Sequence, residues 1–255
     1  MTESKFLQNK VALITGGAGG IGWGIGMEFA REGAQVAIVD IDKRNGEDVF
    51  SRLQGESDGH LFLNQDIRDL DSHRRLVDEI ESKLGPVNIL VNNAGVNSEH
   101  GFLDMTPEAW DRVFNTNLRA HVFLSQLASQ RMIKRGDNGV ILFITSVHQD
   151  YIQGHPHYSS SKAAIKLLIK EMAVELAPHN IRVLGIAPGG IYINKRTEDP
   201  KEANLEPTVL LGGRNGIPRD IGRAAVFLCS DYWARHITGE VLTVSGGQYM
   251  ATHIK

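Results

Sequence analysis

Short runs of consecutive apolar residues alternate along the chain with longer stretches in which apolar residues recur every three or four positions. The short runs have the length of strands, and the longer stretches have the period of amphipathic helices. The pattern therefore predicts seven strands with helices between them. The strands are expected at residues 10–15, 35–40, 61–66, 88–93, 140–146, 181–187 and 240–246.

These strands are apolar at nearly every position rather than at alternate ones, which indicates burial on both faces. Strands that alternate with helices form parallel sheets through right-handed crossovers. The fold class is therefore α/β, a doubly wound (Rossmann) fold with a parallel sheet of about seven strands. No linker, short repeat or low-complexity tract divides the sequence, so residues 1–255 are expected to form a single domain.

The composition and net charge of the chain bear on which binding partners can be expected. The chain is 42% hydrophobic and 22% charged with a net charge of −3, so no attraction to nucleic acid or to an anionic membrane is expected. A single cysteine, Cys229, excludes an intrachain disulfide and favours a reducing compartment. With no apolar signal or spanning segment in the sequence, we expect a cytoplasmic protein.

The first chemical motif is TGGAGGIG, which runs from Thr15 to Gly22 between the first strand and a helix. Glycines at 16, 20 and 22 allow a tight turn and a close approach of a pyrophosphate to the helix N-terminus. A lone glycine cluster is a weak signal, but here strand, turn and helix stand in the required order. The motif predicts a dinucleotide site.

The end of the second strand indicates which dinucleotide. Asp40 can accept hydrogen bonds from the adenosine ribose and would repel a 2′-phosphate. Gly19 stands where a basic residue would help to hold that phosphate, although Lys43 and Arg44 lie close by in sequence. We predict NAD as cofactor, with NADP the less favoured alternative.

A tyrosine and a lysine occur four positions apart in HPHYSSSKAAIKLL. On a helix, Tyr158 and Lys162 share one face. Lowering the pKa of a phenol from 10 to 7 requires about 4 kcal/mol, which a nearby ammonium in a desolvated site can supply. Ser146, after the fifth strand, reaches the same sheet edge and can donate a hydrogen bond to a carbonyl oxygen.

Six motifs together identify a family resemblance: TGGAGGIG, NNAG, FNTNL, ITS, YSSSK and APGG. In order and spacing the chain resembles the short-chain dehydrogenase/reductases over essentially its whole length. The resemblance implies an NAD(P)-dependent oxidoreductase of alcohols or carbonyls, usually a homotetramer. It implies a catalytic tetrad matching Asn117, Ser146, Tyr158 and Lys162, in which Asn117 holds a water of a proton path and Lys162 also binds the nicotinamide ribose.

The same resemblance implies the cofactor contacts, including Asp66 at the adenine ring. The cofactor-binding residues are expected to be Thr15, Gly16, Gly20, Ile21, Gly22, Asp40, Asp66, Ile67, Asn93, Ala94, Gly95, Tyr158, Lys162, Pro188, Gly189 and Ile191. One departure concerns the nicotinamide amide, because Ile193 stands where the family often has a threonine.

The substrate is expected to be a small, polyhydroxylated alcohol or carbonyl compound. ITSVHQ and APGGIYIN look similar to bacterial glucose and other aldose 1-dehydrogenases of the family, and several hydrogen-bonding side chains surround the tetrad. Besides Ser146 and Tyr158, the candidate substrate contacts are His148, His155 and Asn194. The histidine spacing matches no usual zinc arrangement, so no metal is expected.

Residues 189–216 are charged and turn-rich with little periodicity, which is typical of a substrate loop or lid. Two alternatives to a sugar dehydrogenase stay open. One is an NADPH-dependent ketone or 3-ketoacyl reductase, against which Asp40 argues. The other is a non-catalytic NAD-binding sensor or structural module, which would have no need of a phenol and an amine at this spacing.

Overall fold

The computed structural model describes residues 5–152, 154–193, 196–248 and 250. Seven strands form one parallel sheet in the order β3-β2-β1-β4-β5-β6-β7. The strands are β1 Val11–Thr15, β2 Gln35–Asp40, β3 Leu61–Asn64, β4 Val87–Asn92, β5 Gly139–Ile144, β6 Ile181–Pro188 and β7 Val241–Val244. The doubly wound α/β fold predicted from the sequence is confirmed.

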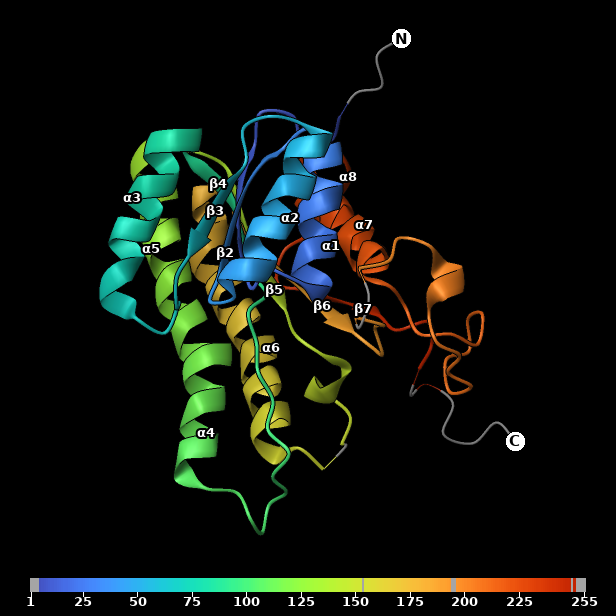
Figure 1. Ribbon diagram of the computed structural model, residues 1–255. Helices are drawn as coiled ribbons and strands as arrows, with labels where there is room; N and C mark the ends of the chain where they lie inside the picture. The colour runs from blue at the N-terminus through green and yellow to red at the C-terminus, as the bar shows by residue number, and fades with distance from the viewer. Residues whose placement is uncertain (1–4, 153, 194–195, 249, 251–255) are drawn as a thin grey trace.

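Helices cover both faces of the sheet (Figure 1). Helices α1, α2 and α7 pack on one face, and α3, α5 and α6 pack on the other. The principal helices are α1 Gly20–Arg31, α2 Lys43–Glu56, α3 His73–Leu84, α4 Pro107–Phe114, α5 Ala120–Arg135, α6 Pro156–Leu176 and α7 Pro218–Cys229, and the short α8 spans Asp231–Ala234. One turn of π-helix, Asn115–Arg119, joins α4 to α5.

Successive side chains of a strand point to opposite faces of the sheet, which explains why apolar residues occupy nearly every strand position. In β1, Ala12 and Ile14 enter the core layer under α1 and α7, whereas Val11 and Leu13 enter the layer under α3 and α5. The inner strands are buried along most of their length. The edge strands β3 and β7 are only partly buried, because each lacks a neighbour on one side.

The order of the strands places a crevice at one edge of the sheet. The chain proceeds outward from β1 to β2 and β3, then returns to the other side of β1 with β4. Loops after β1 and β4 therefore leave the sheet in opposite directions, and a crevice opens between them at the carboxyl ends of the strands.

Candidate active site

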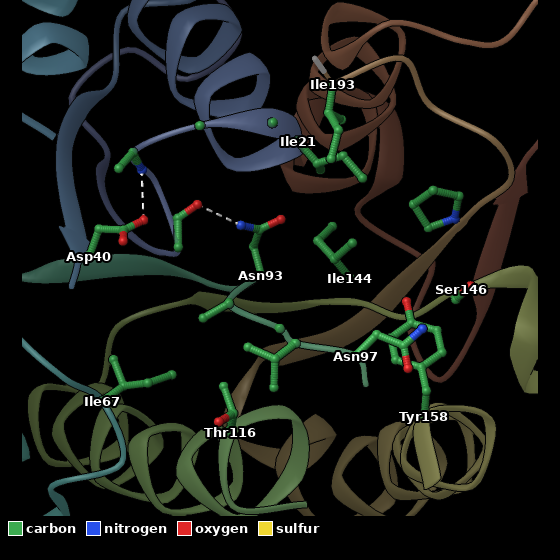
Figure 2. Close-up of a pocket in the computed structure, with 18 of the residues that line it drawn as sticks. Ile21, Asp40, Ile67, Asn93, Asn97, Thr116, Ile144, Ser146, Tyr158 and Ile193 are labelled. Carbon is green, nitrogen blue, oxygen red and sulfur yellow. Dashed lines mark hydrogen bonds between the residues drawn. The ribbon is translucent and has the colours of Figure 1, made fainter. Parts of the chain in front are cut away.

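A cleft of about 1020 Å³ lies at this switch point, lined by the segments that follow β1, β2, β4, β5 and β6. Figure 2 shows Asp40 and Ile67 toward one end of it and Ser146 and Tyr158 toward the other. Fourteen of the expected cofactor residues line this cleft. They are Gly16, Gly20, Ile21, Asp40, Asp66, Ile67, Asn93, Ala94, Gly95, Tyr158, Lys162, Pro188, Gly189 and Ile191.

The glycine loop has the geometry that a closely approaching pyrophosphate requires. Gly16 and Gly20 have φ of +64° and +51°, a conformation that L residues rarely adopt. A Cβ on Gly22 would lie 2.2 Å from the carbonyl oxygen of Gly16, so the third glycine is needed for close packing of loop and helix. At Gly19, by contrast, no described atom lies within 4 Å of an added Cβ.

Thr15 and Gly22, the other two expected cofactor residues, support the cleft from below rather than line it. The Thr15 hydroxyl accepts hydrogen bonds from the backbone N–H groups of Asn93 and Ala94, at 3.0 and 3.1 Å. The Asn93 amide in turn donates to the carbonyl oxygens of Thr15 and Gly16, both at 2.9 Å. The two motifs at the switch point are therefore tied to each other.

Asp40 ends β2 with its carboxylate at the cleft (Figure 2). It accepts one hydrogen bond from the N–H of Ala18 and one from the N–H of Asp42, each 2.9 Å long. A carboxylate offers about four acceptor positions, so capacity for ribose hydroxyls remains. Lys43 and Arg44 are exposed on α2 and do not belong to the described lining of the cleft.

Asp66 also lines the cleft, where its carboxylate is paired with the guanidinium of Arg68. The hydrogen bonds from Arg68 hold the pKa of Asp66 below its usual value. The carboxylate is therefore ionised at neutral pH and fixed by its neighbour.

Ser146 and Tyr158 meet at the opposite end. Ser146 follows β5 and caps a short 3₁₀ turn, where its hydroxyl accepts from the N–H of His148 at 3.2 Å. Tyr158 and Lys162 lie one turn apart on α6, as the spacing predicts. The Lys162 ammonium is buried and donates to the carbonyl oxygen of Ile144 at 2.8 Å.

The electrostatics of this pair differ from the sequence expectation. Burial raises the pKa of Tyr158, and the hydrogen bond with Ser146 opposes that rise without cancelling it. Burial also lowers the pKa of Lys162 to about 8. The expectation that Lys162 brings the phenol near neutrality is not met in the protein alone, because desolvation disfavours the charged form of both groups.

Asn117 has a role that the sequence did not indicate in detail. It lies in the π-helical turn and is fully buried. Its side chain accepts from the N–H of Val96 at 2.8 Å and donates to the carbonyl oxygen of the same residue at 2.9 Å. The amide also donates to Ser161 at 3.3 Å. The side chain thus anchors the segment that follows β4.

Two expected substrate contacts lie near Tyr158. The His148 ring meets the Tyr158 ring edge-on, with centroids 5.3 Å apart, and the His148 and His155 rings are 6.2 Å apart. Both histidines line a second hollow of about 490 Å³ beside the cleft, together with Gln149, Phe102 and Ile152. Asn194 lies outside the described residues. The hollow presents both polar and apolar groups.

The segment 189–216 has little regular structure in its described part, in keeping with its sequence. Arg196 reaches from it to the far side of the cleft, donating to the carbonyl oxygen of Ala18 at 3.0 Å and to Asn45 at 2.6 Å and pairing with Asp48. Glu198 pairs with Arg31 of α1 at 2.7 Å. The segment is therefore held against the glycine loop, α1 and α2.

Sequence reasoning missed two residues of the site region. Arg196 acts across a long separation in the chain, so no local signal reveals its partners. His121 lies four residues after Asn117 and contacts its backbone; the helical spacing of four residues is the signal that could have drawn attention to it.

Within the described part of the chain, no three His, Cys, Asp or Glu side chains come together in a way that could hold a metal ion. Over the same residues, no helix has the length and apolar character needed to span a bilayer.

Comparison with known proteins defines the class. A family model described as short chain dehydrogenase matches residues 10–204. L-rhamnose-1-dehydrogenase of Scheffersomyces stipitis is 36% identical over 253 residues, which cover 96% of this chain and 97% of that protein. The 7alpha-hydroxysteroid dehydrogenase of Escherichia coli K12 is 39% identical over 246 residues, 94% of each chain.

Comparison with a solved structure gives the same family. The 3-ketoacyl-(acyl-carrier-protein) reductase from Brucella melitensis, complexed with NADH, superposes with a TM-score of 0.86 at 33% identity, covering 95% of this chain and 99% of that one. The chain belongs to the short-chain dehydrogenase family. It is an oxidoreductase acting on CH–OH groups, and the family uses a nicotinamide cofactor, NAD or NADP.

Proposed function

We propose that the protein is an NAD-dependent dehydrogenase of a polyhydroxylated secondary alcohol or sugar hemiacetal. The observation that carries the proposal is the layout of the cleft. A partly buried Tyr158 with Ser146 and Lys162 beside it stands at one end, and the Asp40 carboxylate stands at the other. The first group suits proton removal from an alcohol, and the second suits ribose hydroxyls rather than a phosphate.

The catalytic tetrad is then Asn117, Ser146, Tyr158 and Lys162. The nicotinamide supplies the acceptor for the hydride that leaves the carbinol carbon. Tyr158 removes the hydroxyl proton as the carbon–oxygen double bond forms, and Ser146 donates a hydrogen bond to that oxygen. Lys162 favours the phenolate through its charge, while Asn117 holds the Val96 segment in place beside it.

NAD is proposed as the cofactor because of the charge at the adenosine end. A 2′-phosphate placed near Asp40 would meet a carboxylate whose two oxygens already face backbone N–H groups. The cleft fits a dinucleotide at the glycine loop as well, because only the absence of a Cβ at Gly22 allows the loop and helix to close together.

The sugar-like substrate is supported by the hydrogen-bonding groups near Tyr158. Ser98 and His157 are linked at 2.6 Å, and His148, Gln149 and His155 line the adjoining hollow. Buried oxygen and nitrogen atoms of Gln149 and His155 have no protein partner among the described residues, which suits a ligand rich in hydroxyls. The similarity to L-rhamnose-1-dehydrogenase supports the same class.

A second candidate is oxidation or reduction of a less polar compound. Phe102 and Ile152 are 77% and 95% exposed at the mouth of the hollow, where they could contact an apolar skeleton. The relatives that act on hydroxysteroid and ketoacyl groups fit this alternative.

The test is an initial-rate panel with NAD⁺ and NADP⁺ over aldoses, polyols, secondary alcohols and a hydroxysteroid, with NADH- and NADPH-driven ketone reduction in parallel. We expect turnover with NAD⁺ and an aldose or polyol. Tyr158→Phe is the matched control and should retain cofactor binding while losing turnover. Turnover confined to apolar alcohols or to NADPH and ketones would overturn the substrate or cofactor proposal, and full activity of Tyr158→Phe would overturn the mechanism.

We also propose a cytoplasmic homotetramer, with residues 189–216 as the substrate lid of a single domain. The half-buried edge strand β7 and the exposed Leu167 and Val174 of α6 support contacts with further copies of the chain. Light scattering on the purified protein tests the assembly, and a monomer at micromolar concentration would contradict it.

A further inference from the structure

His121 is a buried histidine that the mechanism above does not use. It lies at the start of α5 and is 1% exposed. Its Nδ1 is 3.0 Å from the carbonyl oxygen of Asn117, and its Nε2 is 3.3 Å from the hydroxyl of Thr15. The imidazole thus spans the gap between the glycine loop and the π-helical turn that carries Asn117.

The protonation of this ring follows from its partners. A carbonyl oxygen can only accept, so Nδ1 must carry a proton and donate to Asn117. Burial, with a smaller contribution from the charge of Lys162, lowers the pKa of His121 to about 3. The ring is therefore neutral at physiological pH, and Nε2 must be an acceptor.

The acceptor at Nε2 determines the direction of the Thr15 hydroxyl. The two lone pairs of that oxygen receive the N–H groups of Asn93 and Ala94. Its single proton can point to Nε2 of His121 or to the carbonyl oxygen of Val91, each 3.3 Å away. Only the first choice satisfies the buried Nε2, so the neutral ring favours it.

The result is a continuous chain of hydrogen bonds from the cofactor loop to the tetrad. It runs from Thr15 through His121 to the backbone of Asn117, whose side chain fixes Val96 and reaches Ser161. Ser161 donates to the carbonyl oxygen of Tyr158 at 2.7 Å. An added Cβ on Gly95 would lie 3.6 Å from the Asn117 oxygen and 3.7 Å from Lys162, so the same turn borders the catalytic amine.

We propose that His121 is a positioning residue, which fixes the Asn117 turn relative to the glycine loop as a neutral imidazole with its proton on Nδ1. It is not among the residues that line the cleft. This role rests on the proposed function of the tetrad, but the arrangement of the ring is a property of the protein itself and can be tested without turnover.

The experiment compares His121→Leu, which removes both hydrogen bonds, with His121→Gln, which retains a donor and an acceptor. His60→Leu is the matched control. His60 is also buried, and its ring bridges the N–H of Val36 and the hydroxyl of Ser57 at 3.1 and 3.0 Å, outside the cleft. A purely structural effect of losing a buried bridging imidazole should appear in both positions.

We expect His121→Leu to lower kcat about tenfold, the effect of one or two hydrogen bonds in a desolvated site, while KM for the cofactor changes less than about twofold. His121→Gln should recover most of the loss, and His60→Leu should leave kcat unchanged. Equal kcat values for wild type and a folded His121→Leu would overturn the proposal, as would a matching loss in His60→Leu.

Two measurements remain decisive if the substrate proposal fails. Nitrogen-15 spectra of the histidine rings, assigned with His121→Gln, should show His121 neutral with its proton on Nδ1; a proton on Nε2 would overturn the proposal. The backbone N–H of Val96 donates a hydrogen bond to the Asn117 side chain. Its hydrogen exchange should be about tenfold faster in His121→Leu and unchanged in His60→Leu. An unchanged rate in His121→Leu would also overturn it.

Discussion

The ammonium nitrogen of Lys162 lies 5.6 Å from the centre of the Tyr158 ring, with Lys162 buried at the end of β5 and Tyr158 partly buried beside it. Burial raises the pKa of the phenol and lowers the pKa of the amine to about 8. Burial therefore disfavours the charged form of each group, but Lys162 with a pKa of about 8 is still mostly protonated at neutral pH and carries its charge beside the phenol.

Replacing Lys162 should change the pH profile of alcohol oxidation, because its charge lies beside the Tyr158 phenol. Oxidation requires Tyr158 to accept a proton, so its rate rises with pH as the phenol ionises. In Lys162→Met the compensating charge is lost, and we expect the acid limb of kcat/KM to move up by about one unit or more. An acid limb at the wild-type pH would show that Lys162 does not assist the phenolate.

The same lysine should appear in the pH dependence of stability. Its pKa is about 8 in the folded protein and 10.5 in the reference state, so between these values the unfolded chain binds more protons. The contribution of Lys162 to the free energy of unfolding therefore rises with pH from about 8 to 10.5. In urea unfolding, the free energy of unfolding of the wild type should therefore rise relative to that of Lys162→Met across this pH range.

The difference between the two proteins is the useful quantity, because burial also raises the pKa of Cys229, to about 12. That group ionises in the unfolded chain first and lowers the stability of both proteins alike above its ordinary pKa near 9. A pH-independent difference between wild type and Lys162→Met would contradict a depressed lysine pKa.

Asp40 should control the choice of cofactor. Asp40→Asn keeps an oxygen acceptor for Ala18 but removes the charge. We expect the ratio of kcat/KM for NAD⁺ over NADP⁺ to fall by about tenfold to a hundredfold, through the loss of repulsion of a 2′-phosphate. Gly19→Arg should act in the same direction, since no described atom obstructs a side chain there. Unchanged ratios in both variants would remove Asp40 from the recognition of the ribose.

The glycine loop offers a matched pair of alanine substitutions. In Gly22→Ala the new Cβ would lie 2.2 Å from the Gly16 oxygen and 2.6 Å from the Asn93 amide, so we expect loss of cofactor binding and a destabilisation of about 2 kcal/mol or more. In Gly19→Ala no described atom lies within 4 Å of the new Cβ, so the substitution should be nearly neutral. Titration with NADH and thermal unfolding measure both effects, and similar behaviour of the two variants would contradict the steric argument.

Arg196 should influence cofactor binding, because it ties the described part of the 189–216 segment to the glycine loop and to α2. Arg196→Gln removes its pairing with Asp48 and weakens its hold on Ala18, and we expect KM for NAD⁺ to rise about threefold to tenfold. Arg52→Gln is the control, because Arg52 pairs with the same Asp48 at 3.3 Å but stays on α2. An equal change in both variants would assign the effect to α2 rather than to the segment.

The sequence by itself determined the layers of the fold and the main parts of the site. Uninterrupted apolar runs such as 35–40 are strands because only a sheet covered on both faces buries them, and the order of the motifs brings the glycine loop, Asp40 and Tyr158 to one edge. These conclusions depend on the local periodicity of apolar residues and on the order of strands and helices, and both can be read from the sequence.

Only the tertiary structure decided what the polar atoms do. Thr15 lies under the cleft, Asn117 sits in a π-helical turn bound to Val96, and Arg196 crosses to α2. Each depends on hydrogen bonds between segments distant in the chain, for which residue type alone gives no partner. The direction of the Tyr158 pKa shift also depends on tertiary structure, because burial, which no motif encodes, outweighs the hydrogen bond with Ser146.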